Sequence, residues 1–368
     1  MHDSNAAKLL ARVMGWQDQE SVLENVAKLQ LLAFFKYDSY QRFSPGRRFI
    51  ESLALWLNQF EPEDRPAALE LVKEKLVFFS DAEISHLVEM TYPDLIVQER
   101  LRLVAEENGI PTYEVGKLAR HPRFKELQLK SLYLGLSDGA RTNELRRASN
   151  HRINNEQIWQ AYELGEQKSE SMLKDLEENL KKADFNLQAP HFNLVWLLDD
   201  FSGSGNTYIR YDSEKKSYSG KLKKIYEQLH QRRLIDPSHY EVFLVLYIAA
   251  RQAIDHIEYW SERFTSERGF KPLQLRVLCK LERDLALTNN PTPAIANLLG
   301  KTQYFDTAIA DDKHIKVGGS DGRLGFANCA LPVVLSHNTP NNSVYFLWGP
   351  EQLKYPGLFP RVVRHRDF

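Results

Sequence analysis

One segment, NLVWLLDDFSGSGNT over residues 193–207, constrains this chain more than any other. Its unbroken apolar run predicts a buried strand, and Asp199 and Asp200 stand at the carboxyl end of that strand. In an open α/β sheet, ligands bind at the carboxyl ends of the strands. The glycines of the following loop let backbone N–H groups turn toward an anion, and a helix is predicted to start after Thr207. The segment therefore predicts acceptors for sugar hydroxyls beside a cradle for a phosphate.

The small-residue loop after the strand is the predicted phosphate-binding element. Its backbone N–H groups and its hydroxyl groups are hydrogen-bond donors that suit an anion. An ordinary Gly/Ser turn beside surface aspartates is the alternative interpretation. The combination of a buried strand, paired carboxylates and this loop favours a phosphorylated sugar as the ligand. The candidate binding residues are Ser202, Gly203, Ser204, Gly205, Asn206 and Thr207.

Composition excludes several classes of protein. The 368 residues include 48 Lys and Arg against 49 Asp and Glu, and this net charge of −1 argues against coating nucleic acid by charge alone. Two cysteines, Cys279 and Cys329, exclude a disulfide scaffold and a zinc site of three or four thiolates. The longest apolar run, residues 242–250, is far shorter than the ~20 residues of a membrane span, and the first residues lack a signal-peptide core. We therefore expect a cytoplasmic globular enzyme or regulator without a membrane partner.

The spacing of apolar residues changes near residue 125 and predicts two domains. Before that point, apolar residues recur every three or four positions, which predicts an all-helical domain over residues 1–125, either a bundle or winged-helix-like, for docking or as a lid. Beyond it, short apolar runs alternate with helices, which predicts an α/β domain over residues 126–368. Continuous apolar strands favour a mostly parallel sheet with helices on both faces. The predicted strands lie at residues 132–136, 192–198, 241–250, 273–281, 330–335 and 343–348.

The stretch LLDDFSGSGNT resembles the phosphoribosyl pyrophosphate (PRPP) motif of type I phosphoribosyltransferases, in which an apolar strand and two acidic residues precede a small-residue loop. The resemblance implies that family's α/β fold for residues 126–368. It also implies that Asp199 and Asp200 contact the ribose 2′- and 3′-hydroxyls, directly or through Mg²⁺, while residues 202–207 hold the 5′-phosphate. Gly203 stands where purine-salvage members carry an aspartate, which argues against an ordinary purine-salvage role.

A second segment, LYLGLSDGAR over residues 132–141, predicts a strand that runs into a tight loop. In type I phosphoribosyltransferases the pyrophosphate loop lies at such a place, ahead of the PRPP motif. By that analogy Ser137, Asp138 and Gly139 would face the pyrophosphate, and Arg141 would be its cation, since the guanidinium presents a rigid fork of donors to phosphate. A turn with a surface salt bridge is an equally good interpretation.

A third segment, GFANCALPVVLSHNTPNNS over residues 325–343, predicts a strand followed by an Asn-rich loop. Asn338 in that loop could read a base or amide edge, or it could belong to a turn. Together with the PRPP-like motif, this ending resembles the phosphoribosyltransferase-like (PRTase-CE) proteins of bacterial conflict and anti-phage systems. That resemblance implies a defence-associated effector or regulator with a protein or nucleic-acid partner.

Two kinds of function follow from these expectations. As an enzyme, a glycosyltransferase, the chain would bind Mg²⁺–PRPP or a related ribose phosphate and transfer or hydrolyse at the anomeric carbon. Asp199 and Asp200 would anchor the sugar, Arg141 with Mg²⁺ would balance the departing pyrophosphate, and Asp200 is the nearest candidate for a general base. As a binding module, the same pocket would sense PRPP or a nucleotide. A vestigial pocket in an assembly subunit is a third alternative, and a homodimer is the default oligomeric state.

Overall fold

The structure is a computed structural model that describes residues 2–41, 43, 46–185, 190–306, 309, 318 and 321–361. The chain divides into two compact units: unit 1 comprises Met1–Glu83 with Glu282–Phe368, and unit 2 comprises Ile84–Leu281. This division differs from the predicted boundary near residue 125. Residues 84–125 pack within unit 2, where Glu99 pairs with Arg276 of the sheet. The C-terminal segment instead packs with the N-terminal helices in unit 1.

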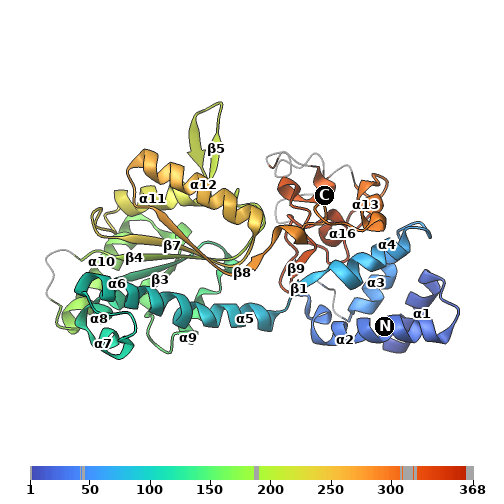
Figure 1. Cartoon of the computed structure of the whole chain (residues 1–368), viewed down its shortest axis with the longest axis horizontal. Helices are drawn as coiled ribbons and strands as arrows, with labels where there is room; N and C mark the ends of the chain where they lie inside the picture. Colours follow the sequence, from blue (N-terminus) through green and yellow to red (C-terminus); the bar gives the residue numbers. More distant parts are fainter. Residues whose placement is uncertain are drawn as a thin grey trace. The chain divides into compact units, whose positions relative to one another are not determined.

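Unit 2 is built on a five-stranded sheet in the order β3-β2-β4-β7-β8, in which all neighbouring strands are parallel (Figure 1). The strands are β2 (Ser131–Gly135), β3 (Ile158–Gln160), β4 (Leu194–Ser202), β7 (Glu241–Ala250) and β8 (Leu273–Leu281). Every residue of β7 after Glu241 is buried, as expected for a strand covered on both faces. The prediction of an α/β fold with a mostly parallel sheet is confirmed.

Helices flank this sheet, with α11 and α12 on one face and α6 and α9 on the other (Figure 1). Apolar side chains of α10, α11 and α12 join those of β4 and β7 in one core. A small antiparallel hairpin of β5 and β6 projects beyond α12 (Figure 1). The other elements of unit 2 include η3 (Thr91–Val97), α6 (Gln98–Asn108), α7 (Val115–Arg120), α8 (Pro122–Leu129), η4 (Asp138–Ala140), α9 (Thr142–Ala148), η5 (Asn155–Gln157), η6 (Ala161–Glu163), α10 (Glu166–Lys182), β5 (Arg210–Asp212), β6 (Ser217–Ser219), α11 (Lys221–Gln231) and α12 (Arg251–Arg268).

Unit 1 combines the first helices of the chain with its C-terminal segment. Phe359 is fully buried there, and its ring contacts the rings of Phe49 and Phe78, so aromatic packing joins the two ends of the sequence. Its elements include α1 (Asp3–Met14), α2 (Gln19–Phe35), α3 (Phe49–Leu57), α4 (Arg65–Glu70), η2 (Leu71–Lys75), β1 (Val77–Phe79), α13 (Pro293–Gly300), β9 (Val333–Leu335) and α16 (Tyr345–Trp348). Helix α5 (Asp81–Met90) begins at the end of the first part of this unit.

Two predicted strands near the C-terminus differ from the structure. The run at residues 343–348 forms the short helix α16, because a short buried apolar run carries no periodicity that separates strand from helix. The run at residues 330–335 does contain a strand, β9, but it pairs in parallel with β1 and lies outside the five-stranded sheet. Among the described residues, no helix is both long and apolar enough to cross a membrane.

Candidate functional site

The candidate site lies at the carboxyl end of the central strands β2 and β4. The register of the parallel pair places Gly135 beside Leu198, so the residues that follow both strands meet at one edge of the sheet. Asp199 and Asp200 are among the last four residues of strand β4, and the Ser137 hydroxyl donates a hydrogen bond to Asp199 Oδ1. The structure thus brings together the two predicted segments, which are about sixty residues apart in the sequence.

Asp199 is buried and surrounded by donors. The residue is only 3% exposed. Besides Ser137, the Asp200 backbone N–H donates to Oδ1 over 3.2 Å. On the other oxygen, Tyr208 Oη donates over 2.8 Å and Lys221 Nζ over 3.1 Å. Four donors therefore fill the hydrogen-bonding capacity of this carboxylate, which has about four lone-pair positions.

Burial changes the ionisation of the groups around Asp199. Burial raises the pKa of Asp199, and the neighbouring charge of Asp200 raises it further, while Lys221, Ser137 and Tyr208 act in the opposite direction. Burial also raises the pKa of Tyr208 well above its ordinary value, and Asp199 adds to that effect. Tyr208 therefore keeps its proton and remains a hydrogen-bond donor at neutral pH.

Asp200 lies under the loop that follows strand β2. Its Oδ1 accepts a hydrogen bond from the Phe201 backbone N–H over 2.9 Å. A Cβ atom added at Gly139 would lie 2.2 Å from Asp200 Oδ2, so only a glycine lets the loop approach this carboxylate so closely. The buried Tyr247 holds the loop in place, because its hydroxyl donates to the Ala140 carbonyl over 2.7 Å.

Arg141 ends this loop in a left-handed backbone conformation, with φ of 48°. Its guanidinium Nη1 donates to Ser85 Oγ over 3.1 Å and lies 3.3 Å from Glu144 Oε2. The salt bridge that the turn interpretation predicts is therefore present. The predicted pyrophosphate-binding role of Arg141 stays a prediction, as do the roles of Asp138 and Gly139.

The loop at residues 202–207 presents a row of unused backbone donors. Within the described part of the chain, the N–H groups of Gly203, Ser204, Gly205 and Thr207 donate to no protein acceptor. Gly205 has a φ of +80°, and a Cβ atom there would approach the Ala253 carbonyl of α12 to 3.0 Å. Successive N–H groups around a left-handed residue form a concavity that suits an anion.

The sequence predicts that a helix starts directly after this loop, and this prediction is wrong. Instead the chain forms the β5–β6 hairpin and then returns, so that the Lys221 backbone N–H donates to the Thr207 carbonyl over 3.1 Å. Asn206 lies at the turn, where its N–H is 3.4 Å from Ser204 Oγ. The first helix after the loop is therefore α11, which begins at Lys221.

Asn338 is the one predicted site residue that lies in unit 1. Its Oδ1 accepts a hydrogen bond from the Thr339 backbone N–H over 3.1 Å, and its own N–H donates to the Leu335 carbonyl. These are the contacts of a turn, the second of its two interpretations. Its predicted contact with a base remains untested.

The family of the chain is shown by most of its length and not by one motif alone. A sequence model of the PRTase-CE family matches residues 53–361, which is more than four-fifths of the chain. The chain belongs to the PRTase-CE family. Comparison with curated proteins found no match, and comparison with solved structures found none either. Membership supports a phosphoribosyltransferase-like function for this PRTase-CE chain, in agreement with the resemblance of its LLDDFSGSGNT motif.

Three residues of the candidate site were not predicted from the sequence: Tyr208, Lys221 and Tyr247. Tyr247 lies in the apolar run of β7, where an aromatic residue is ordinary core. Lys221 carried a faint signal, because a lysine at the first position of a helix opposes the helix dipole and gains from a nearby anion. Nothing in the sequence indicated that the anion would be Asp199.

Magnesium fits this site only in part. Both oxygens of Asp199 already accept hydrogen bonds from protein donors, one of them an ammonium group. Asp200 is therefore the carboxylate that could hold a hard cation, together with oxygens of the substrate. Within the described residues, no group of three His, Cys, Asp or Glu side chains is placed to hold a metal ion. A metal held by both aspartates, as the sequence predicts, would require Lys221 to leave Asp199.

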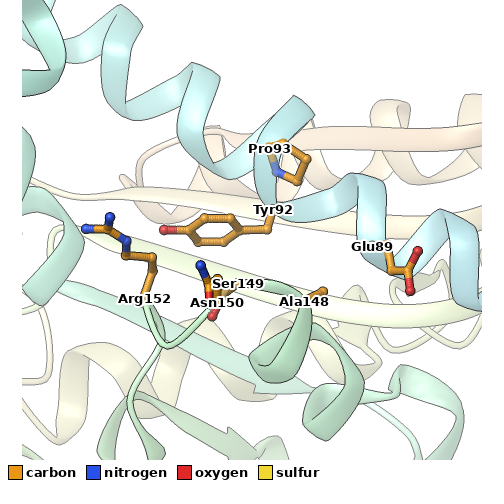
Figure 2. Close-up of a pocket in the computed structure, with 7 residues that line it drawn as sticks. All are labelled: Glu89, Tyr92, Pro93, Ala148, Ser149, Asn150 and Arg152. Carbon is orange, nitrogen blue, oxygen red and sulfur yellow. The ribbon is translucent and has the colours of Figure 1, made fainter.

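A separate pocket of about 520 Å³ lies between η3 and the loop after α9 (Figure 2). None of the predicted site residues lines it. The Tyr92 ring points between the two walls, and its hydroxyl oxygen accepts a hydrogen bond from the buried Arg100 over 2.9 Å. The lining residues are Glu89, Tyr92, Pro93, Ala148, Ser149, Asn150 and Arg152.

Proposed function

We propose that this PRTase-CE chain binds a phosphorylated ribose at the loop of residues 202–207 and acts at its anomeric carbon. The observation that supports this proposal most strongly is the row of unpaired backbone N–H groups in that loop, next to the Asp200 carboxylate. Peptide N–H groups that already point at one place bind a phosphate without reorganisation. The Asp200 carboxylate, at the end of the strand that leads into the loop, would accept hydrogen bonds from sugar hydroxyls.

The chemistry would use these fixed charges. Departure of a group from the anomeric carbon leaves a cationic, oxocarbenium-like sugar, and a nearby carboxylate stabilises that positive charge. Asp200 is proposed for this role. Arg141 would balance the departing group if its guanidinium turned from Glu144 toward the ligand. The acceptor would be water or a group on a partner protein or nucleic acid, in the proposed setting of a bacterial defence system.

A non-catalytic sensor is the second candidate. It is favoured by the protein partners of Arg141 and Asp199, because both charged groups are already engaged by side chains of the chain itself. In that case ribose phosphate would bind at the same loop without turnover. An assay that measures release of the group on the anomeric carbon, with the product identified by chromatography, separates the two candidates. Release indicates an enzyme, and binding without release indicates a sensor.

The proposal is tested by isothermal titration calorimetry with ribose 5-phosphate, PRPP and nucleoside 5′-monophosphates. Asp200→Asn is expected to weaken binding by at least about tenfold, since hydrogen bonds to a charged group contribute ~1.5–3 kcal/mol. Asp184→Asn, which changes an exposed aspartate of the same unit, is the matched control and should bind like the wild type. Failure of the wild type to bind any of these ligands would refute the proposal.

Gly139→Ala gives a second, steric test of the same site. Its methyl group would meet Asp200 Oδ2 at 2.2 Å and push the carboxylate from its place, so we expect at least about tenfold weaker binding of ribose 5-phosphate. Gly165→Ala is the control, because no atom lies nearer than 4.0 Å to a Cβ there. Equal affinities of the two variants would show that Asp200 does not contact the ligand.

A further inference from the structure

The lysine beside Asp199 has no counterpart among the residues predicted for the site. Lys221 Nζ lies 3.1 Å from Asp199 Oδ2, and it also lies 5.5 Å from the centre of the Tyr208 ring. The Asp199 side chain is 4% exposed and that of Lys221 is 31% exposed. The ammonium therefore reaches the site from its solvent side and neutralises a carboxylate that the protein otherwise buries.

The position of Lys221 is fixed by the backbone as well as by its ion pair. It is the first residue of α11, and its backbone N–H donates to the Thr207 carbonyl at the end of the phosphate-binding loop. Gly220, just before it, has a φ of +121° and packs so closely that a Cβ would lie 2.4 Å from the Tyr208 carbonyl oxygen. These contacts attach the start of α11 to the loop and so hold the backbone of Lys221 near Asp199.

This arrangement is unfavourable to a divalent cation at Asp199. Such a cation would have to share the carboxylate with an ammonium that lies 3.1 Å from Oδ2, and two positive charges beside one carboxylate repel each other. Removing the lysine from Asp199 would also cost its hydrogen bond. A positive charge is thus already present at the carboxylate, supplied by the chain itself.

We propose that Lys221 supplies the cation of this site, so that the chain binds a ribose carrying a single 5′-phosphate without a divalent metal. The ligand class is then ribose 5-phosphate or a nucleoside 5′-monophosphate, in preference to a metal-bound diphosphate. The inference rests on the proposed function, because it concerns the ligand of the same loop. In this proposal the phosphate is bound by the unused backbone N–H groups of the loop, which are those of Gly203, Ser204, Gly205 and Thr207. The sugar hydroxyls face Asp200, and Lys221 neutralises the buried carboxylate of Asp199.

The experiment compares calorimetric titrations in EDTA and in excess MgCl₂. Wild-type affinity for ribose 5-phosphate and for nucleoside 5′-monophosphates is expected to change by less than about twofold, well under the ~1.4 kcal/mol of a tenfold effect. PRPP with magnesium should bind no more tightly than the monophosphates. The separate titrations with ribose 5-phosphate and with each nucleotide show whether the base contributes.

Variants at Lys221 connect the result to this side chain. Lys221→Met should weaken binding in EDTA by at least about tenfold and make it respond to magnesium, whereas Lys221→Arg should retain metal-independent binding. If Lys221→Met does not fold, the pair Asp199→Asn with Lys221→Met removes both charges and serves instead. The paired variant is expected to bind ribose 5-phosphate in EDTA within about tenfold of the wild type, because neither lost charge leaves an unpaired partner.

The outcomes distinguish the role of Lys221 from the proposed sugar-phosphate function. Tightening of wild-type binding by magnesium of tenfold or more would overturn the role of Lys221 and leave the proposed sugar-phosphate function intact. Wild-type affinity of a folded Lys221→Met in EDTA, or a loss of binding of well over tenfold in the paired variant, would also overturn it. Absence of binding to every ribose phosphate, with and without metal, would instead remove the proposed function.

Discussion

Lys221→Met is expected to lower the free energy of unfolding by about 3–5 kcal/mol, the usual cost of removing one partner of a buried ion pair. The physical reason is Asp199, because this buried carboxylate would lose its counter-charge and would have either to remain charged without a cation or to take up a proton. Tyr208 and Ser137 would still donate hydrogen bonds, but neither supplies a positive charge. Urea unfolding followed by circular dichroism measures the change.

The same helix provides a matched control. Lys223 has the same 31% side-chain exposure as Lys221, but the side chain of its partner Glu227 is 37% exposed and lies 3.8 Å away. Lys223→Met is therefore expected to change stability by less than about 1 kcal/mol. The double variant Asp199→Asn with Lys221→Met should be more stable than Lys221→Met alone, since it leaves no unpaired buried charge. Equal stability losses for Lys221→Met and Lys223→Met would contradict the assigned role of the pair.

Gly220→Ala is expected to have the second largest effect, a loss of about 3 kcal/mol or more. Its φ of +121° is a conformation that L-residues rarely adopt, and its new methyl would meet the Tyr208 carbonyl oxygen at 2.4 Å. Strain of ~1–3 kcal/mol and overpacking of similar size then add, because backbone cannot move aside as a flexible side chain can. The start of α11 would move off the loop, so affinity for ribose phosphate should fall as well.

Gly269→Ala separates strain from steric conflict. Gly269 also has a left-handed φ, +65°, but no atom lies within 4 Å of a Cβ at that position. Its replacement should cost only about 1 kcal/mol, the penalty of the backbone conformation alone. Thermal unfolding of both variants gives the comparison. A similar melting temperature for the two would mean that the contact of Gly220 with Tyr208 is not rigid.

Local sequence patterns predicted strand β4 and the small-residue loop that comes after it, whereas the roles of the paired carboxylates remain predictions. An unbroken apolar run predicts strand β4, and the amphipathic spacing at residues 220–233 predicts helix α11. Both depend on neighbours within a few residues, which is why they can be recognised without a structure. The pairing of β9 with β1 depends on residues more than 250 positions apart, and the spacing of apolar residues contains no information about it.

The sequence by itself therefore determined which chemical groups the segment supplies: two aspartates at a strand end and a loop of small residues that presents backbone N–H groups. Tertiary structure alone decided how that chemistry is used. Parallel pairing of β2 with β4 brought Ser137 to Asp199, and the return of the chain after the hairpin brought Lys221 to its other oxygen. Burial then made these contacts consequential, because a carboxylate removed from water must find its donors and its counter-charge within the protein. One aspartate thus became internal, and its neighbour Asp200 is the carboxylate that we propose as the contact of a ligand.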